Sequence, residues 1–514
     1  MVLRLYFAIV WLLPGVGWAQ SGASRDWLTW GGDAARTGWA KAETTLSRDN
    51  IDRLELKWKT QLDNPSGVGV LSPLTAPVAI ENVRTVQGSR TLVFVVGSQD
   101  IVYALDGASG KVVWQKSFPN EMKPAQEAGV NCPNVQNSTP VIDREAGILY
   151  VISSDGKLRG LSLADGKERI AATDFVKPFS RNWSLNLIDG VVYTTVARGC
   201  GGAQSTITGM SVRDPGHPIV KFATSTTRSA GAWGSGGPVL GPKGFLIQTA
   251  DGLLDVSKGI WGNSVMQFSL KNLEVTDRFT PENAQFLTQK DLDLGSSSPI
   301  AFRYGNWDLV AAAGKEGTIY LLDGNSLGGA EHRTALFSQK YGNDDFSSGQ
   351  LHPAHGVWGA MSTAEDAIGN RWLYVPMWGP LAQNAPPFQN RHGMADSGSV
   401  LGFQLGVENG KPVLLPKWMS RSMSVPEPPV IVNGMVFCIS SGEQTQQHPL
   451  TPQERTSWVS HAILYAFDTT TGKELYSSNQ LIDGWSHFGG LAVAGGRIYA
   501  VTYQNRVYSF GLKQ

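Results

Sequence analysis

The sequence predicts an all-β fold, an eight-bladed β-propeller built from four-stranded antiparallel blades. A hairpin pattern recurs along the chain: an alternating apolar strand, an Asp/Gly-rich turn and a second strand, as in "IVYALDGASGKVVWQ" at residues 101–115. A strand such as "LVFVVGS" or "ILYVISS" precedes each hairpin, and a short apolar segment such as "TAPVAI" or "STPVID" precedes that strand. The chain contains 59 glycines and only 17% charged residues, which is typical of a large core with many tight turns.

The repeats return eight times, about 45 to 70 residues apart. Related hairpins are "KLRGLSLADGKERI", "TITGMSVRDPGHPIV", "SVMQFSLKNLEVTDRF", "TIYLLDGNSLGGA", "SVLGFQLGVENGKPVLLPKW" and "ILYAFDTTTGKELY". A single small sheet has two apolar faces and cannot bury them alone, whereas radial packing of such sheets buries both. The repeats therefore predict a closed ring of blades.

The two ends of the repeat region predict how the ring closes. "LELKWKTQL" at 54–62 is a lone strand, and the last unit, ending in "RVYSFGLKQ", lacks its fourth strand. We therefore expect the N-terminal strand to pair with the C-terminal blade, which removes exposed sheet edges. The predicted organisation is a signal peptide at 1–19, an N-terminal segment at 20–53 that crosses one face, and the propeller at 54–514.

The recurring turn itself indicates structure and not function. In the first hairpin Asp106 can accept hydrogen bonds from its own turn, and the following glycine supplies a positive φ. Trp114 and Trp418, which follow such turns, are expected to cover the space between blades. Chemistry is therefore expected elsewhere, near the axis of the ring.

The first twenty residues indicate the compartment. "MVLRLYFAIVWLLPGVGWAQ" has an early Arg4, an apolar stretch, and Gly17 and Ala19 at the −3 and −1 positions of a cleavage site. The alternative is a membrane anchor, but the stretch has about ten residues where a span needs about 20. We expect a secreted or periplasmic protein that does not span the membrane. Its formal net charge of zero argues against nucleic acid as a partner.

Three cysteines are present, and in an oxidising compartment two of them are expected to pair. Cys132 and Cys200 lie in loops rich in Gly, Pro and Asn. If a disulfide forms, we expect it to join these two residues. Cys438 lies in an apolar strand, where a buried free thiol is the default. No C-x-x-C-H motif marks a haem attachment site.

Polar and aromatic residues precede the expected innermost strands and so converge near the axis. They are Asn137, Arg181, Asn182, Trp183, Trp233, Asp293, His355, Trp358, Glu427, Trp485 and His487. Such a set suits a polar site bounded by aromatic surfaces. The alternative is a plug of residues that bond only to one another. A zinc site made by His352, His355 and His392 is disfavoured by the nearby proline and by the lack of cysteine ligands.

"WGGDAARTGWA", "LELKWKTQL", "VYALDGASGKVVW" and "LYAFDTTTGKELY" together resemble the quinoprotein (pyrroloquinoline quinone-repeat) propellers over nearly all of residues 27–514. That family includes alcohol and sugar dehydrogenases, which hold the quinone (PQQ) over a metal ion, usually calcium. It also includes non-catalytic relatives such as the BamB-type outer-membrane assembly factor. The resemblance implies the fold strongly and the chemistry weakly, because the repeat motif lies at the rim.

Three segments resemble dehydrogenase motifs. "DLDLGSSSPI" places Asp293 at the catalytic aspartate, where it would take the alcohol proton and also bind the metal. "AAAGKEGTIYLLD" places Lys315 at a cationic contact to the quinone; a solvated turn lysine is the alternative. "QTADGLLD" places Asp251 where the family has an asparagine metal ligand. Trp233, Trp358, Asn182 and His487 complete the set of residues expected to bind the cofactor.

Two departures from the family weaken this interpretation. "GGAQ" puts neutral Gln204 where the family has a glutamate metal ligand, and the family's adjacent Cys-Cys pair is absent. Aromatic residues such as Trp233, Trp358 or Trp378 are candidates for the missing stacking surface. Two functions follow: PQQ-dependent oxidation of a small alcohol or sugar with a separate electron acceptor, or a propeller scaffold that binds a protein or polysaccharide partner.

Overall fold

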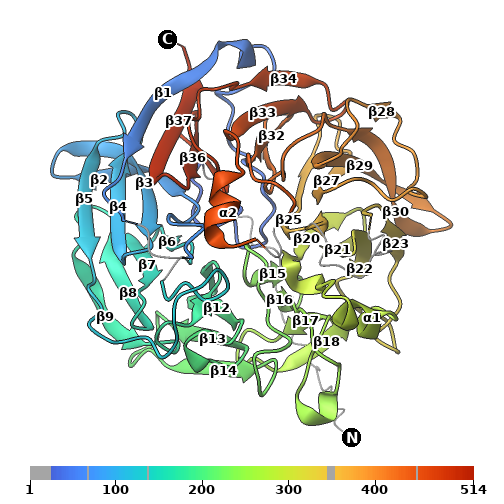
Figure 1. Cartoon of the computed structure of the whole chain (residues 1–514), viewed down its shortest axis with the longest axis horizontal. Helices are drawn as coiled ribbons and strands as arrows, with labels where there is room; N and C mark the ends of the chain where they lie inside the picture. Colours follow the sequence, from blue (N-terminus) through green and yellow to red (C-terminus); the bar gives the residue numbers. More distant parts are fainter. Residues whose placement is uncertain (1–24, 66–68, 136–137, 344–353, 447–449, 514) are drawn as a thin grey trace, which may run out of the picture.

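The computed structural model describes the whole chain except residues 1–24, 66–68, 136–137, 344–353, 447–449 and 514. The expected signal peptide, Asn137 and His352 therefore lie outside the described residues. Eight antiparallel sheets surround one axis, and colour runs once around the ring with the sequence (Figure 1). The predicted all-β, eight-bladed propeller is confirmed.

The first four blades follow the chain from the innermost to the outermost strand. They are β2 (Val78–Thr85), β3 (Gly88–Gly97), β4 (Ile101–Asp106) and β5 (Val112–Ser117); β6 (Val141–Asp143), β7 (Ile148–Ile152), β8 (Lys157–Ser162) and β9 (Glu168–Asp174); β10 (Arg181–Asn182) and β11 (Asn186–Ile188) beside β12 (Val191–Ala197), β13 (Thr206–Ser211) and β14 (Ile219–Ala223); and β15 (Val239–Gly241), β16 (Gly244–Gln248), β17 (Val265–Phe268) and β18 (Val275–Phe279).

The other four blades have the same arrangement, except that in the second and the last of them the outermost strand comes earlier in the chain than the strand it pairs with. They are β20 (Ile300–Tyr304), β21 (Trp307–Ala313), β22 (Thr318–Asp323) and β23 (Phe337–Lys340); β24 (Gly356–Val357) and β26 (Ser362–Glu365) beside β27 (Arg371–Trp378), β29 (Gly398–Glu408), β30 (Lys411–Met419) and β28 (Asn390–Arg391); β31 (Val430–Val432), β32 (Met435–Ser440), β33 (Ile463–Asp468) and β34 (Glu474–Ser477); and β35 (Leu491–Ala494), β36 (Arg497–Thr502), β37 (Arg506–Leu512) and β1 (Leu54–Gln61). Near the axis, β19 (Ser297–Ser298) pairs in parallel with β25 (Gly359–Ala360).

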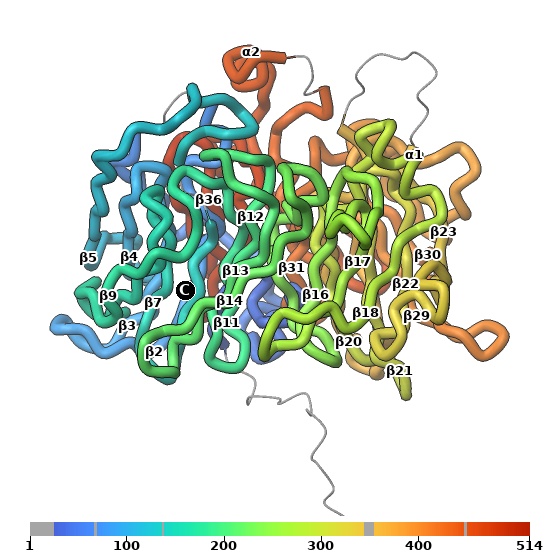
Figure 2. The backbone as a smooth tube through the Cα atoms, turned by 90° about the horizontal axis from the view of Figure 1, so that it is seen from below, coloured from blue at the N-terminus to red at the C-terminus, as the bar shows by residue number. Residues whose placement is uncertain are grey.

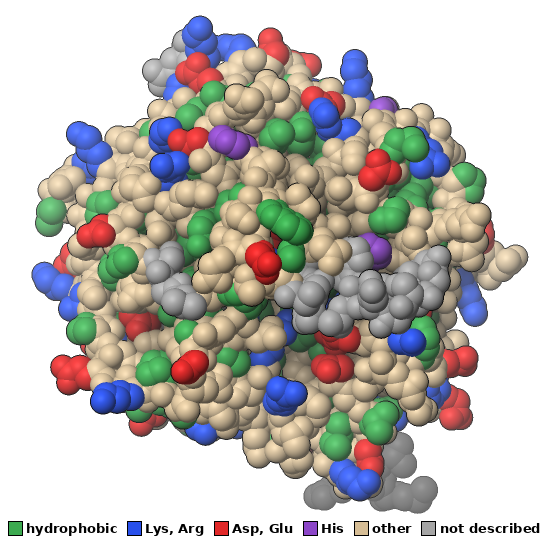
Figure 3. Space-filling model, viewed as in Figure 1, with side chains coloured by type: hydrophobic (Ala, Val, Ile, Leu, Met, Phe, Trp, Pro, Cys, Tyr) green, Lys and Arg blue, Asp and Glu red, His purple; other side chains and the backbone are tan. Residues whose placement is uncertain are grey.

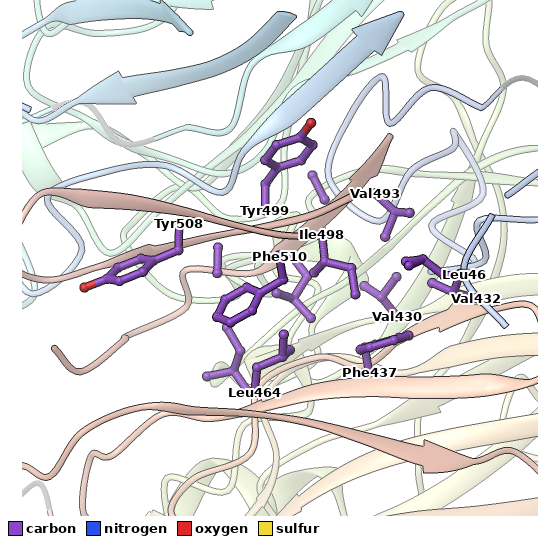
Figure 4. Close-up of a cluster of buried hydrophobic side chains, with 14 of the residues drawn as sticks. Leu46, Val430, Val432, Phe437, Leu464, Val493, Ile498, Tyr499, Tyr508 and Phe510 are labelled. Atoms are coloured by element: carbon purple, nitrogen blue, oxygen red, sulfur yellow. The ribbon is translucent and has the colours of Figure 1, made fainter. Parts of the chain in front are cut away.

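The ring closes by pairing its first strand with its last, as predicted. β1 runs antiparallel to β37, from Leu54 opposite Leu512 to Gln61 opposite Arg506. Figure 4 shows the apolar core beside this closure, where side chains from the last two blades meet Leu46 of the N-terminal segment. Each fully buried large apolar side chain contributes about 1.5 to 3 kcal/mol to folding.

A tryptophan on an outer strand docks on the turn of the next blade. The Trp114 indole donates to the Leu163 carbonyl at 2.9 Å, and its ring lies where a Cβ of Gly166 would stand. Trp418 repeats the arrangement with Thr469 at 2.8 Å. Because the turn glycine has a positive φ and no Cβ, it admits the indole. The tryptophans are inter-blade contacts, as the sequence predicted.

The N-terminal segment seals one end of the axis. Residues 27–40 bond to the innermost strands of six blades, β2, β6, β11, β15, β26 and β31. Two short helices, α1 (Ala284–Gln289) and α2 (Pro452–Ser457), project from the other face (Figure 2). In the described part of the chain, no helix is both long and apolar enough to cross a membrane.

Candidate functional site

A cavity of about 1350 Å³ opens on the face that carries α1 and α2. Its walls come from loops that connect or precede inner strands of several blades, and Arg455 of α2 contributes from above. In the matching surface view, basic and acidic side chains are scattered over this face without one dominant sign (Figure 3). The charged residues that lie close together are those that line the cavity.

Three carboxylates gather at one side of the cavity. Oxygen atoms of Asp251, Asp291 and Asp293 all lie within 4.8 Å of one another. Asp251 follows β16, whereas the other two precede β20, so adjacent blades build the cluster. The Asp251 amide donates to Asp293 Oδ1 at 2.9 Å, which fixes the two segments against each other.

Lys315 neutralises part of this acidic cluster. Its Nζ lies 2.8 Å from Asp291 Oδ1 and 2.7 Å from Asp293 Oδ2. The same ammonium lies 5.4 and 5.2 Å from the ring centres of Trp233 and Trp358, so the aromatic faces add a cation–π contribution. Lys315 is thus a cluster residue and not a solvated turn lysine.

The pKa values of buried Asp293 and of Asp251 shift in opposite directions. Burial would raise the pKa of Asp293, but Lys315 and then Arg198 outweigh it, and the pKa lies below its usual value. Partial withdrawal from water and repulsion by Asp293 and Asp291 raise the pKa of Asp251 to about 6. The cluster therefore carries more negative charge than its cations compensate.

A glycine turn allows this close arrangement. Lys315 lies between Gly314 and Glu316 in the tight connection from β21 to β22. A Cβ on Gly314 would stand 2.5 Å from the Asp293 carbonyl oxygen and 2.6 Å from Leu294 Cα. Because backbone atoms leave no room there, glycine lets the Lys315 amide donate to the Asp293 carbonyl at 3.1 Å.

Indoles form a connected aromatic wall beside the cluster. Trp358 stacks on buried Trp378 with ring centres 4.8 Å apart and planes 4° apart. Trp233 meets Trp358 edge-on at 5.2 Å, and Trp183 meets Trp233 at 6.4 Å. Such a wall offers flat apolar surface next to charged groups.

A disulfide also lies at the cavity. Cys132 and Cys200, the pair considered from the sequence, are bonded and have Cα atoms 5.2 Å apart, while Cys438 is a buried free thiol. Arg181 and Arg198 flank this bridge and both line the cavity. Burial and the neighbouring Arg198 and Arg455 charges lower the pKa of Arg181 to about 9.

A second charged group joins α2 to the cavity wall. Buried Glu443 accepts from Arg455 Nη2 at 2.5 Å and contacts His487 Nδ1 at 2.6 Å. Burial opposes ionisation of Glu443, but His487 and Arg455 together hold its pKa below the usual value. This triad fixes α2 beside the mouth of the cavity.

Of the residues expected from the sequence to act in catalysis or to bind a cofactor or metal, six line the cavity: Asp251, Asp293, Lys315, Trp233, Trp358 and His487. It does not contain Asn182, which is buried and accepts from the Ser180 hydroxyl at 3.0 Å. Gln204 is exposed, donates to the Thr226 carbonyl and does not line the cavity. The structure therefore brings neither amide to the carboxylates.

The third carboxylate of the cluster is Asp291, which the sequence reading did not single out. It stands two residues before Asp293 in the same "DLDLG" segment, so the repeated acid was a usable signal. Of the histidines weighed for zinc, His355 lines the cavity, while His392 contacts the Thr471 carbonyl. Among the described residues, the acidic trio is the only group of metal-ligating type that was found.

Sequence comparison relates part of this chain to known proteins. Residues 55–194 match the family described as outer membrane protein assembly factor BamB. Quinohemoprotein alcohol dehydrogenase ADH-IIG of Pseudomonas putida is 25% identical over 164 residues, which are 32% of this chain and only 20% of that protein.

Solved structures extend the likeness to nearly the whole chain. The Pseudomonas putida quinohemoprotein alcohol dehydrogenase has a TM-score of 0.58 at 12% identity, covering 95% of this chain and 80% of that one. A europium-containing methanol dehydrogenase also has a TM-score of 0.58, at 13% identity, covering 95% and 98%. At such identities the likeness shows the fold. The resemblance expected from the repeats is confirmed: this chain is similar to the quinoprotein β-propellers and has their fold.

Proposed function

We propose that this propeller is a secreted or periplasmic PQQ-dependent oxidoreductase that oxidises alcohols or sugars and passes electrons to a separate acceptor. One observation carries the proposal: a buried aspartate, Asp293, is held ionised by Lys315 inside a wide cavity with aromatic walls. An ionised carboxylate in such a place is a base ready for a substrate hydroxyl.

The cavity residues fit a planar quinone carrying carboxylates. Partly exposed Trp358 backed by Trp378 offers a flat face, and the cystine lies on another wall. The acidic trio fits a hard cation such as calcium, because carboxylate oxygens are its preferred ligands. The raised pKa of Asp251 comes from partial burial and then from repulsion by Asp293 and Asp291, and a cation would relieve that repulsion. Asp251, Asp291 and Asp293 would hold that ion, with Asp291 supplying the anion that Gln204 lacks.

The quinone would supply the two-electron oxidant for the alcohol. Asp293 would accept the hydroxyl proton of the substrate, and Lys315 would keep that carboxylate deprotonated until the substrate arrives. The indole wall would exclude water from one side of the reacting carbon. The Glu443 triad would hold α2 in place beside the entrance.

The test is reconstitution of the purified protein with PQQ and calcium. We expect a bound-quinone absorption spectrum and quinone-dependent reduction of a dye with a panel of alcohols and sugars. Asp293→Asn should abolish turnover and retain the quinone spectrum, because the amide cannot accept the proton.

A matched control is Asp165→Asn, which removes an exposed turn aspartate paired with Lys167 at the rim. Its turnover should equal that of the unaltered protein. Unchanged turnover in Asp293→Asn would remove Asp293 from the proposed role, and lack of quinone binding at micromolar concentration would reject the cofactor.

The match of residues 55–194 to the BamB description favours a second candidate, a quinone-free scaffold. In that case the cavity mouth would bind a protein or polysaccharide partner. This candidate gains support if the protein binds neither quinone nor calcium and yet retains a stable fold in the same titrations.

A further inference from the structure

We infer that the cavity is built for a ligand with a carboxylate group, so that the substrate class is a hydroxy acid and not a neutral alcohol. The feature that carries this inference is a pair of arginines, Arg181 and Arg198, on the wall beside the Cys132–Cys200 bridge. Turnover of such a substrate rests on the proposed function, whereas its binding does not.

The two guanidinium groups are held in place without an acidic partner. Arg181 Nη1 donates to the Val130 and Asn131 carbonyls, each at 2.9 Å, and Arg198 Nη1 donates to Asn131 Oδ1 at 3.0 Å. Within the described part of the chain, neither arginine forms an ion pair, and the Nε atom of each is buried with no hydrogen-bond partner. Among the described residues, no hydrogen bond engages the Nη2 atom of either arginine, so each guanidinium keeps a donor for a ligand in the cavity.

The disulfide fixes this geometry. Cys132 follows Asn131 directly, and Cys200 lies two residues after Arg198, so the bridge joins the loop that supplies the acceptors to the loop that supplies an arginine. Each guanidinium also lies over an indole, Arg181 at 5.0 Å from Trp183 and Arg198 at 4.4 Å from Trp233. A preorganised pair of planar forks is the arrangement that matches a carboxylate.

The arginine pair and the acidic cluster share one aromatic wall. Trp233 contacts Arg198 at 4.4 Å and Lys315 at 5.4 Å from its ring centre. Burial lowers the pKa of Arg198, and the charges of the aspartates in the acidic cluster oppose that lowering. The charges that act on Arg181 are those of Arg198 and Arg455, which are both cationic. A small molecule lying along Trp233 would thus present its carboxylate toward Arg181 and a hydroxyl toward Asp293.

The test compares D-gluconate with D-sorbitol, which have the same carbon chain and differ in a carboxylate against a hydroxymethyl group. Binding to the full chain is measured by calorimetry at constant ionic strength. We expect gluconate to bind at least about tenfold more tightly than sorbitol, since charge-assisted bidentate bonds are worth more than neutral ones. Equal binding of the two, or binding of neither, overturns the inference.

Arg181→Gln should weaken gluconate at least about tenfold and leave sorbitol unchanged, and Arg198→Gln provides an independent second variant. Arg303→Gln is the matched control, because that side chain is 65% exposed on β20. Circular dichroism and the melting temperature verify the fold of each variant. A loss of gluconate binding in Arg303→Gln equal to that in Arg181→Gln would refute specific recognition.

A parallel quinone titration separates this inference from the proposed function. We expect Arg181→Gln to bind PQQ as the unaltered protein does. If the variant loses PQQ affinity in step with gluconate, the arginines serve the cofactor and the inference fails while the oxidoreductase proposal stands. If no quinone binds but gluconate is still preferred, the oxidoreductase proposal fails and the organic-acid site stands.

Discussion

Replacement of Lys315 by methionine isolates the charge that holds the acidic cluster together. The methionine keeps the length and apolar body of the side chain but removes the ammonium that contacts Asp291 and Asp293. The side chains of Lys315 and Asp293 are only 12% and 5% exposed. Breaking a buried ion pair costs about 3 to 5 kcal/mol, because the remaining charge stays buried without a partner. We expect about 3 kcal/mol, since Asp291 at the other end is 72% exposed.

The loss should depend on pH in a defined direction. In the unaltered protein the pKa of Asp293 is depressed, so its contribution to stability is present above the unfolded-state pKa and is lost as the pH falls through the lower folded-state value. Without Lys315, burial and the neighbouring aspartates would raise that pKa above the unfolded value. The variant should then gain stability on acidification, so the difference between the two proteins shrinks between about pH 7.5 and about pH 4.5.

The assay is urea unfolding followed by tryptophan fluorescence at both pH values. Lys290→Met is the matched control, because Lys290 lines the same cavity and is exposed. Adding Asp293→Asn to Lys315→Met should recover most of the loss, since no uncompensated buried charge remains. A loss below about 1 kcal/mol, or one that is the same at both pH values, would refute the reasoning.

Three further predictions concern the supports of the cavity. The double variant Cys132→Ser/Cys200→Ser opens a loop of 68 residues and should lower the free energy of unfolding by up to about 4 kcal/mol. A melting temperature equal to that of the unaltered protein under oxidising conditions would contradict this. Gly314→Ala should cost about 1 to 3 kcal/mol and weaken calcium binding, because the new methyl group meets backbone on two sides; wild-type values in both denaturation and calorimetry would count against it. Asp251→Asn should raise the melting temperature near pH 7.5 and have no effect near pH 4, where Asp251 with its pKa of about 6 is already protonated; a lower melting temperature at neutral pH would show that its charge stabilises the cluster.

The architecture could be predicted from the sequence because it is encoded locally and then repeated. The turn at Asp106 illustrates this: its carboxylate accepts from the Ser109 amide at 2.8 Å, and Gly110 has a φ of +71°. The tryptophan that follows, Trp114, reaches the next blade as expected. The turn and the tryptophan after it are each encoded by a few neighbouring residues. Because related hairpins recur along the chain, the repeat can be recognised from the sequence.

The site was predictable only in part because its residues come from loops of different blades and meet only when the blades pack around the axis. Asp293 and Lys315 stand in segments that resemble family motifs, and they were named in advance. No sequence motif marks Arg198 or Glu443. Arg198 directly follows β12, and Glu443 lies near the start of the long connection between β32 and β33. Gln204 was assigned only from the likeness of "GGAQ" to a family segment, and its side chain donates to the Thr226 carbonyl instead.

The pairing of β1 with β37 has a consequence for biosynthesis. A ribosome delivers β1 early, whereas β37, its partner, emerges after the other blade strands, so the nascent propeller is an open arc with two unpaired sheet edges until β37 has emerged. During that interval the arc is prone to sticking to other copies of itself. A chaperone that covers the two free sheet edges until residue 512 is available would therefore most improve the yield of correctly folded molecules.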